Sequence, residues 1–181
     1  MLHLVQRCTW RVFALMSGIV LATLCAGTAQ AHDGAHRAGE PAAPVKHWDF
    51  TLPTLDGTRF VQPSKIEGPV LVNFWGRDCP PCVAELPRLQ AFARDNPGWT
   101  VLLVATDAPA ESSQFLQQRG ITLPALRPGA NVSALMRTAG NRQAALPFSV
   151  ALRGGAVCHA QLGEVSAAQL GTLKSECGAP R

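Results

Sequence analysis

The chain has 181 residues, of which 47% are hydrophobic, and this is ample for one packed core. Its 16 basic residues include Arg7 and Arg11, which precede an uncharged stretch; without them 14 basic residues face 12 acidic ones, a net charge of +2. Tyrosine is absent and no basic run is interleaved with aromatic residues, so the composition argues against nucleic acid as a ligand.

The N-terminus is typical of a secretory signal. Residues 12–25 carry no charge, and the Ala-Gln-Ala tripeptide at 29–31 supplies small residues at the cleavage positions. We therefore expect a signal peptide over 1–31 and a periplasmic mature protein with no stable membrane span. An uncleaved anchor is the alternative, because the uncharged run approaches the roughly 20 residues that a spanning helix needs.

Export changes how the six cysteines are interpreted. Cys8 and Cys25 lie in the predicted signal, and lipidation of Cys25 is a minor alternative because Leu24 stands where such sites usually carry a small residue. An even number remains, which permits complete pairing in an oxidising compartment. The remaining cysteines are Cys79, Cys82, Cys158 and Cys177.

The mature chain begins with residues 32–47, which show no apolar period and predict a flexible leader before one domain over 48–181. Asp56-Gly57 lies between two short apolar runs and indicates a hairpin. Next, residues 70–75 (VLVNFW) and 99–106 (WTVLLVAT) predict strands buried on both faces, and residues 80–95 between them predict a helix. This order implies a parallel strand pair with a crossover helix.

The second half of the chain continues the alternation of helices and strands. Gly154-Gly155 suits a tight hairpin turn, and Ser166 with Gln169 forms a capping box for a last helix, whose apolar stripe ends in Cys177. The other predicted segments are helices at 110–119 and 132–137, a loop at 122–129, and strands at 148–152 and 156–162. Together they predict an α/β fold, a mixed sheet with helices on both faces.

The Cys79-Pro80-Pro81-Cys82 motif falls between a buried strand and the first turn of the next helix. The helix terminus stabilises a thiolate, and the three-residue offset brings the two sulfurs within bonding reach. We expect Cys79 to be the exposed nucleophile and Cys82 the buried thiol that resolves a mixed disulfide. The alternative is a static bridge or half of a zinc site, but the sequence has no second ligand pair at comparable spacing, so no metal is predicted.

The segments VLVNFWGRDCPPCVAELPRL and ALPFSVALRGGAVCHAQLG resemble the TlpA-type periplasmic thioredoxin-like reductases, relatives of the cytochrome c maturation thioredoxins. The resemblance covers residues 48–176. It implies a thioredoxin fold with an N-terminal β-hairpin extension, thiol-disulfide oxidoreductase activity as an enzyme, and no cofactor besides the redox-active disulfide.

The resemblance also implies roles for residues around the motif. Pro147 matches the proline that thioredoxins keep in the cis form beside the active disulfide, and Leu146 would offer its backbone to a substrate chain. The ordinary alternative for Pro147 is a proline at a strand start. Trp75, Pro80 and Pro81 are further predicted substrate contacts.

Cys82 needs a proton acceptor, because a buried thiol attacks well only as the thiolate. Thioredoxin itself uses an Asp in the preceding strand, and the matching residue here is Asn73, which cannot ionise. Glu85 matches the glutamate of the family pattern CxxCxxExP and is the predicted substitute. The alternative for Glu85 is a solvated surface residue.

Asp78 stands where relatives usually carry Trp. Its carboxylate should disfavour the Cys79 thiolate and make the disulfide less oxidising, unless Arg77 neutralises it. Pro80 and Pro81 offer no N–H to either sulfur, which has the same effect. We therefore hypothesise a reductant, and replacing Asp78 with Trp should move the equilibrium with glutathione toward a more oxidising couple.

Cys158 and Cys177 are the second departure from the family. Strand alternation places Cys158 on the side of Ala156, Ala160 and Leu162, and a structural disulfide with Cys177 is the favoured prediction. Two buried free thiols or a second redox pair are the alternatives, which thiol counting distinguishes.

A copper-binding metallochaperone is the alternative function, since His32, His36, His47 and His159 accompany the cysteine pair. Copper titration of the dithiol form discriminates between the two functions. The chemistry of a reductase implies client protein disulfides or thiols and a membrane thiol donor as partners, and we expect a monomer.

Overall fold

A computed structural model describes residues 47–178. The predicted signal peptide at 1–31, and the leader at 32–47 except for its last residue, lie outside the described residues. Within residues 47–178, no helix combines the length and the apolar character needed to cross a membrane.

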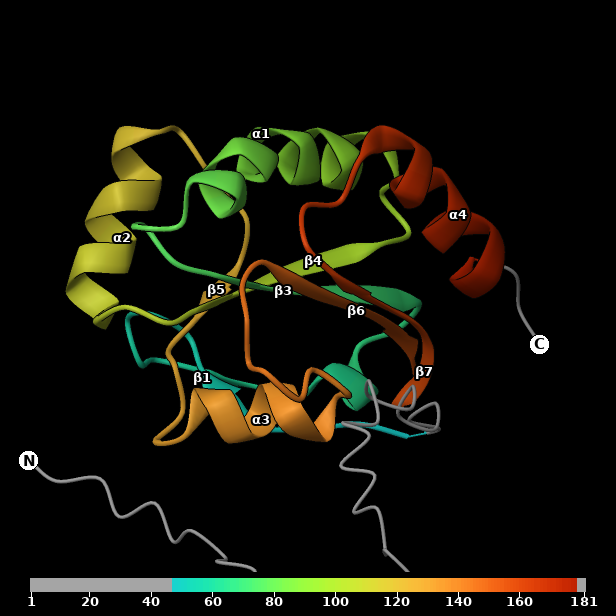
Figure 1. Cartoon of the computed structure of the whole chain (residues 1–181), viewed down its shortest axis with the longest axis horizontal. Helices are drawn as coiled ribbons and strands as arrows, with labels where there is room; N and C mark the ends of the chain where they lie inside the picture. The colour runs from blue at the N-terminus through green and yellow to red at the C-terminus, as the bar shows by residue number, and fades with distance from the viewer. Residues whose placement is uncertain (1–46, 179–181) are drawn as a thin grey trace, which may run out of the picture. The chain divides into compact units, whose positions relative to one another are not determined.

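The centre of the fold is a five-stranded mixed sheet in the order β5-β4-β3-β6-β7 (Figure 1). Its strands are β3 (Pro69–Trp75), β4 (Thr100–Ala105), β5 (Ala125–Leu126), β6 (Phe148–Arg153) and β7 (Ala156–Leu162). β3 pairs in parallel with β4 and antiparallel with β6. The central position of β3 explains why it is apolar except at Asn73, because both of its faces are buried.

Helices cover both faces of the sheet, as the sequence predicted. α1 (Pro80–Asp95) and α4 (Ala167–Cys177) lie over one face and α3 (Val132–Thr138) over the other, with α2 (Pro109–Gln118) beside the β4 and β5 end (Figure 1). Successive β3 residues alternate between two apolar cores: Leu71 and Trp75 face α1 and α4, whereas Val72 and Phe74 face α3. We call these the α1/α4 core and the α3 core.

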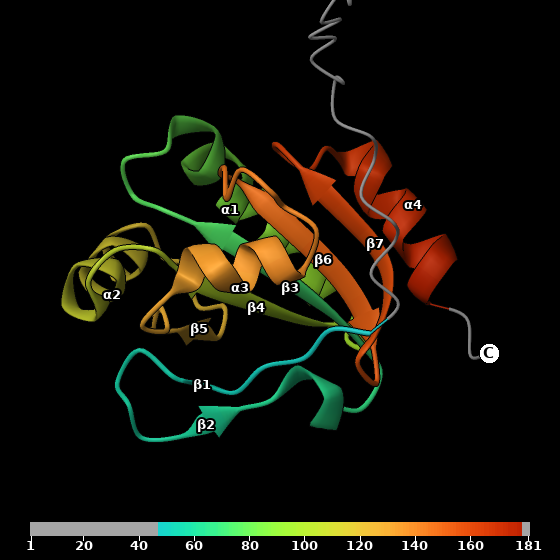
Figure 2. The ribbon, with the colours of Figure 1, turned by 60° about the horizontal axis from the view of Figure 1, so that its bottom comes forward.

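The predicted N-terminal hairpin is present but short. β1 (Leu52–Pro53) pairs antiparallel with β2 (Phe60–Val61), and the 3₁₀ helix η1 (Pro63–Lys65) follows (Figure 2). The hairpin is attached to the main sheet by an isolated bridge between Thr54 and Leu126. Leu126 belongs to β5, a strand within the segment that we predicted to be a loop.

One irregularity in β7 corrects a prediction. The pairing with successive residues of β6 steps from His159 to Val157, so Cys158 has no partner of its own. Such a bulge interrupts the side-chain alternation. The prediction that Cys158 shares a face with Ala160 and Leu162 is therefore wrong. Cys158 packs against the α1/α4 core instead.

Candidate functional site

Cys79 and Cys82 lie at the start of α1, where β3 ends and the crossover begins. They form a disulfide with a Cα–Cα distance of 5.3 Å. Cys79 is the N-cap residue and is partly exposed, whereas Cys82 has no exposed surface and belongs to the α1/α4 core. This difference in access matches the predicted division into an attacking and a resolving sulfur.

The helix terminus offers the sulfur of Cys79 one backbone donor. The N–H of Cys82 donates to Cys79 Sγ over 3.4 Å. Pro80 and Pro81 occupy the first two helical positions and have no N–H to contribute. A thiolate on Cys79 would therefore receive the field of the helix terminus but fewer hydrogen bonds than an ordinary N-terminus provides.

Glu85 lies one turn below the cysteines and is fully buried, which excludes the alternative of a surface residue. Its Oε1 accepts a 2.7 Å hydrogen bond from Asn73 Nδ2, and its Oε2 accepts a 2.8 Å bond from the backbone N–H of Val165. The Asn73 amide also donates to Ser149 Oγ at 3.0 Å. Burial raises the pKa of the Glu85 carboxyl, and the bonds from Val165 and Asn73 oppose that shift.

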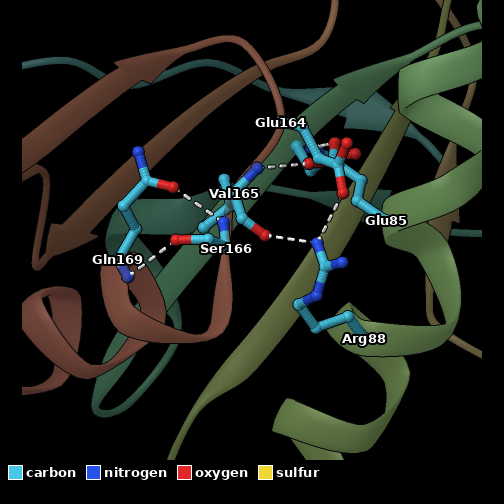
Figure 3. A network of polar contacts seen from close by, with 7 residues as sticks. Glu85, Arg88, Glu164, Val165, Ser166 and Gln169 are labelled. Carbon is cyan, nitrogen blue, oxygen red and sulfur yellow. Dashed lines mark hydrogen bonds and ion pairs between the residues drawn. The ribbon is translucent and has the colours of Figure 1, made fainter.

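Sequence reasoning missed two of these partners. Asn73 was considered only as a residue that cannot ionise, yet it is the side-chain donor that orients Glu85. Val165 acts through its backbone N–H, a group that every residue but proline carries, so no residue type signals it. Figure 3 shows this contact beside Arg88, which donates to Glu164 Oε1 at 2.8 Å and to the Val165 carbonyl at 2.7 Å.

The charged residues before Cys79 form an exposed cluster. The Asp78 side chain is 86% exposed, and its Oδ2 lies 3.6 Å from Arg77 Nε. Arg77 Nη2 also lies 3.5 Å from Glu111 Oε2, so its charge is shared between two carboxylates. Neutralisation of Asp78 by Arg77, which we named as the exception to the Asp78 effect, has a geometric basis, but it is partial and exposed to solvent.

The Leu146–Pro147 peptide bond is cis, in agreement with the prediction. Pro147 is buried and Leu146 is partly exposed. A Cβ built on Gly76 would lie 3.5 Å from Leu146 Cδ1, so this dipeptide sits beside the loop that leads into Cys79.

The predicted substrate contacts separate into two groups. Pro80 and Pro81 are exposed, and Pro80 lines a hollow of about 620 Å³ together with Arg77, Asp78, Val83, Pro87 and Arg119. Trp75 has no exposed surface, and its ring packs against Phe115 at a centroid distance of 5.6 Å. The prediction that Trp75 contacts substrate is wrong for this structure, because the residue faces the α1/α4 core.

A second disulfide joins Cys158 of β7 to Cys177 at the end of α4, with a Cα–Cα distance of 5.5 Å. The adjacent pair, His159 Nδ1 and Glu176 Oε2, lies 2.7 Å apart. His159 is thus engaged beside the second disulfide, whereas His32 and His36 lie outside the described residues. Among residues 47–178, no group of three or more His, Cys, Asp or Glu side chains is arranged to hold a metal ion.

The fold and the cysteine pair at a helix N-terminus together define a thioredoxin-like protein. Residues 43–147 match the model of the AhpC/TSA family, and the chain belongs to that family. The thioredoxin-like kinship that the sequence motifs suggested is therefore confirmed.

Named relatives agree with this assignment. The chain is 32% identical over 104 residues to sporulation thiol-disulfide oxidoreductase A of Bacillus subtilis, covering 54% of this chain and 58% of the relative. It is 32% identical over 92 residues to thiol-disulfide oxidoreductase ResA of Halalkalibacterium halodurans, covering 49% of each. The chain thus spans about half the length of these curated relatives.

A solved structure extends the likeness over more of the fold. The thioredoxin-related protein from Neisseria meningitidis serogroup B has a TM-score of 0.62 and 27% identity, and the match covers 71% of this chain and 99% of that one. The predicted fold class is confirmed.

Proposed function

We propose that the protein is an exported thiol-disulfide oxidoreductase that reduces disulfides of client proteins through Cys79 and Cys82. The observation that carries the proposal is the disulfide at the N-terminus of α1, which joins one partly exposed and one fully buried cysteine. Both named curated relatives are thiol-disulfide oxidoreductases, which supports the same activity here.

The reaction begins with the dithiol form. The Cys79 thiolate attacks one sulfur of the client disulfide; a mixed disulfide forms and the second client sulfur leaves as a thiolate. Cys82 then loses its proton and attacks Cys79 Sγ, so that the Cys79–Cys82 disulfide forms and the first client sulfur leaves. Two electrons pass from the protein dithiol to the client, and no other redox group is needed.

Glu85 is the proposed acceptor of the Cys82 proton. It lies three residues after Cys82 on the same helix, and burial raises its pKa, which improves its match to a proton-transfer role near neutral pH. Asn73 and Val165 each hold one carboxylate oxygen, so the side chain is oriented from the sheet and from the start of α4.

The client chain is proposed to lie against the exposed edge of the motif. Leu146 and Pro147 would support its backbone, and the hollow lined by Pro80, Val83 and Pro87 would accept its side chains. Arg77 and Asp78 border the same hollow and would tune the redox couple.

The reductant direction is supported by two features that disfavour the Cys79 thiolate. Pro81 withholds the backbone donor of the second helical position, and Asp78 places a negative charge directly before Cys79 in the chain. A reductant in the periplasm requires electrons, which a membrane thiol donor would supply.

The proposal that the protein is exported rests on the sequence of residues 1–31. We also propose that the protein is a monomer.

A trapping experiment tests this function. Replacing Cys82 with Ser removes the resolving sulfur, so client and donor proteins should accumulate on Cys79 as mixed disulfides that dithiothreitol releases. Cys79→Ser is the matched control and should trap nothing by this route. Absence of any Cys79-dependent adduct, under both reducing and oxidising growth, would count against the proposal.

A further inference from the structure

A short connection between β7 and α4 touches two parts of the proposed site. We call residues 163–166 the strap. The N–H of Gly163 donates to the Pro147 carbonyl at 2.9 Å, and the N–H of Val165 donates to Glu85 Oε2 at 2.8 Å. Two backbone groups two residues apart thus contact the cis proline and the buried carboxylate (Figure 3 shows the second contact).

α1 holds the strap from the other side. Arg88 binds the Glu164 carboxylate and the Val165 carbonyl, and Val165 itself is fully buried. Ser166 then caps α4, since its Oγ accepts from the Gln169 N–H while its own N–H donates to Gln169 Oε1. The strap is therefore fixed at both ends by hydrogen bonds that leave little freedom for the Val165 N–H.

The strap also lies inside a covalent loop. The Cys158–Cys177 disulfide joins the β7 segment before the strap to the end of the helix after it. The same junction carries the His159–Glu176 pair and two bonds from Arg153, to the carbonyls of Cys177 at 3.1 Å and Gly178 at 2.9 Å. The bulge at Cys158 turns that sulfur toward α4 and so makes the closure feasible.

We propose that the Cys158–Cys177 disulfide and Arg88 are positioning elements for proton transfer at Cys82, because they hold the strap that orients Glu85. This inference rests on the proposed function and extends it: the second disulfide does not exchange electrons with clients but sets the geometry of the acceptor. Arg88 holds the strap from α1 through the Glu164 carboxylate and the Val165 carbonyl.

The groups that face Glu85 give the sign of the effect. Cys82 and Arg88 lie on its own helix, Glu164 lies on the strap, and neutral Asn73 and Ser149 come from the sheet. Arg88 and the Val165 N–H favour the charged carboxylate, whereas burial and Glu164 disfavour it. Loss of the Val165 hydrogen bond or of Arg88 should therefore favour the protonated acid and shift proton acceptance to higher pH.

The test compares the full chain with two variants, Cys158→Ala/Cys177→Ala and Arg88→Met, and with the control Arg94→Met. Arg94 lies on the same helix and, among residues 47–178, pairs only with its exposed neighbour Asp95. Each protein is reduced at Cys79 and Cys82 alone, which is checked by a gain of two free thiols over the oxidised form, and is then mixed with saturating oxidised glutathione. The rate of disulfide closure by Cys82 is then measured across pH.

We expect the acid limb of the rate profile to move to higher pH in both test variants, with a severalfold loss of rate on that limb, and to stay unchanged in Arg94→Met. If the rate profiles of both test variants coincide with that of the unmodified chain, the inference is overturned. A lower free energy of unfolding would then mean only that the disulfide stabilises the fold. A shift in Arg88→Met alone would remove the disulfide from the mechanism.

A different result would mark failure of the proposed function itself. If Cys79→Ser exchanged with glutathione as fast as the unmodified chain, the activity would not reside at this motif. Failure of the proposed function is distinguishable from failure of the inference, because Cys79→Ser reveals it without any change at the strap.

Discussion

The backbone N–H of Cys82 donates to Cys79 Sγ at 3.4 Å and is the first amide of α1 that is able to do so. An N-cap side chain normally accepts from the second or third helical residue. Here Pro81 holds the second position and Cys82 the third, so one of the two usual donors is missing. Restoring this donor should change the reduction potential of the Cys79–Cys82 couple.

Replacing Pro81 with Ala should therefore stabilise the Cys79 thiolate. A hydrogen bond to a charged group contributes about 1.5 kcal/mol or more. For a two-electron couple this corresponds to a reduction potential about 30 mV less negative. The equilibrium with glutathione measures the potential, and the ultraviolet absorbance of the thiolate should develop at lower pH.

Pro80→Ala is the matched control, because an N–H at the first helical position does not point to the capping atom. Its potential should stay close to that of the unmodified chain. Equal shifts in the two variants would mean that helix flexibility, and not the added donor, governs the potential.

Replacing Asp78 with Asn should also make the reduction potential less negative, but by a smaller amount than Pro81→Ala. Removing the negative charge favours the Cys79 thiolate, but the side chain is 86% exposed and already near Arg77. The effect should shrink as salt is raised, since exposed charges are screened. At high salt, the reduction potential of Asp78→Trp should agree with that of Asp78→Asn. A reduction potential that becomes more negative in both variants would contradict the role given to Asp78.

The sequence predicted the parts of the fold that have a strong pattern. The buried run of β3, the start of α1 after Cys79 and the Ser166 cap all agree with the structure. β5 was missed because two residues, Ala125–Leu126, are too few to show a period, and only pairing with β4 makes them a strand.

The site was harder to predict where it depends on three-dimensional context. The face of Cys158 depends on a bulge, which has no residue signature in this strand. Trp75 was predicted to contact substrate, whereas strand alternation directs its ring into the α1/α4 core. The Val165 donor follows from tertiary packing alone.

Removing the second disulfide should lower stability as well as affect Glu85. Cys158 and Cys177 are 19 residues apart, and in the chain-entropy model a loop of this length contributes about 3 kcal/mol to the free energy of unfolding. Urea denaturation of Cys158→Ala/Cys177→Ala should show this loss. The unmodified chain, denatured without reductant, should expose no free thiol from this pair; two titratable thiols there would contradict the bond.

Replacing Glu85 with Gln should change how stability depends on pH. Burial raises the pKa of Glu85 in the folded protein above its usual 4.5. Folding therefore favours the protonated acid, and this contribution is fully present below the usual value and is lost as pH rises through the raised pKa. Urea denaturation across this interval should show a decline in the unmodified chain that the variant lacks.

Glu85→Gln should also be less stable than the unmodified chain at low pH. The NH2 end of the Gln amide must face a donor, either Asn73 Nδ2 or the Val165 N–H. An unsatisfied buried donor costs about 1–3 kcal/mol. The gap between the two proteins should narrow as pH rises and Glu85 ionises. Glu67→Gln, which replaces an exposed carboxyl, serves as the control and should keep the decline. A parallel pH dependence in Glu85→Gln and the unmodified chain would mean that Glu85 does not titrate in this interval, and its role as proton acceptor would fall with it.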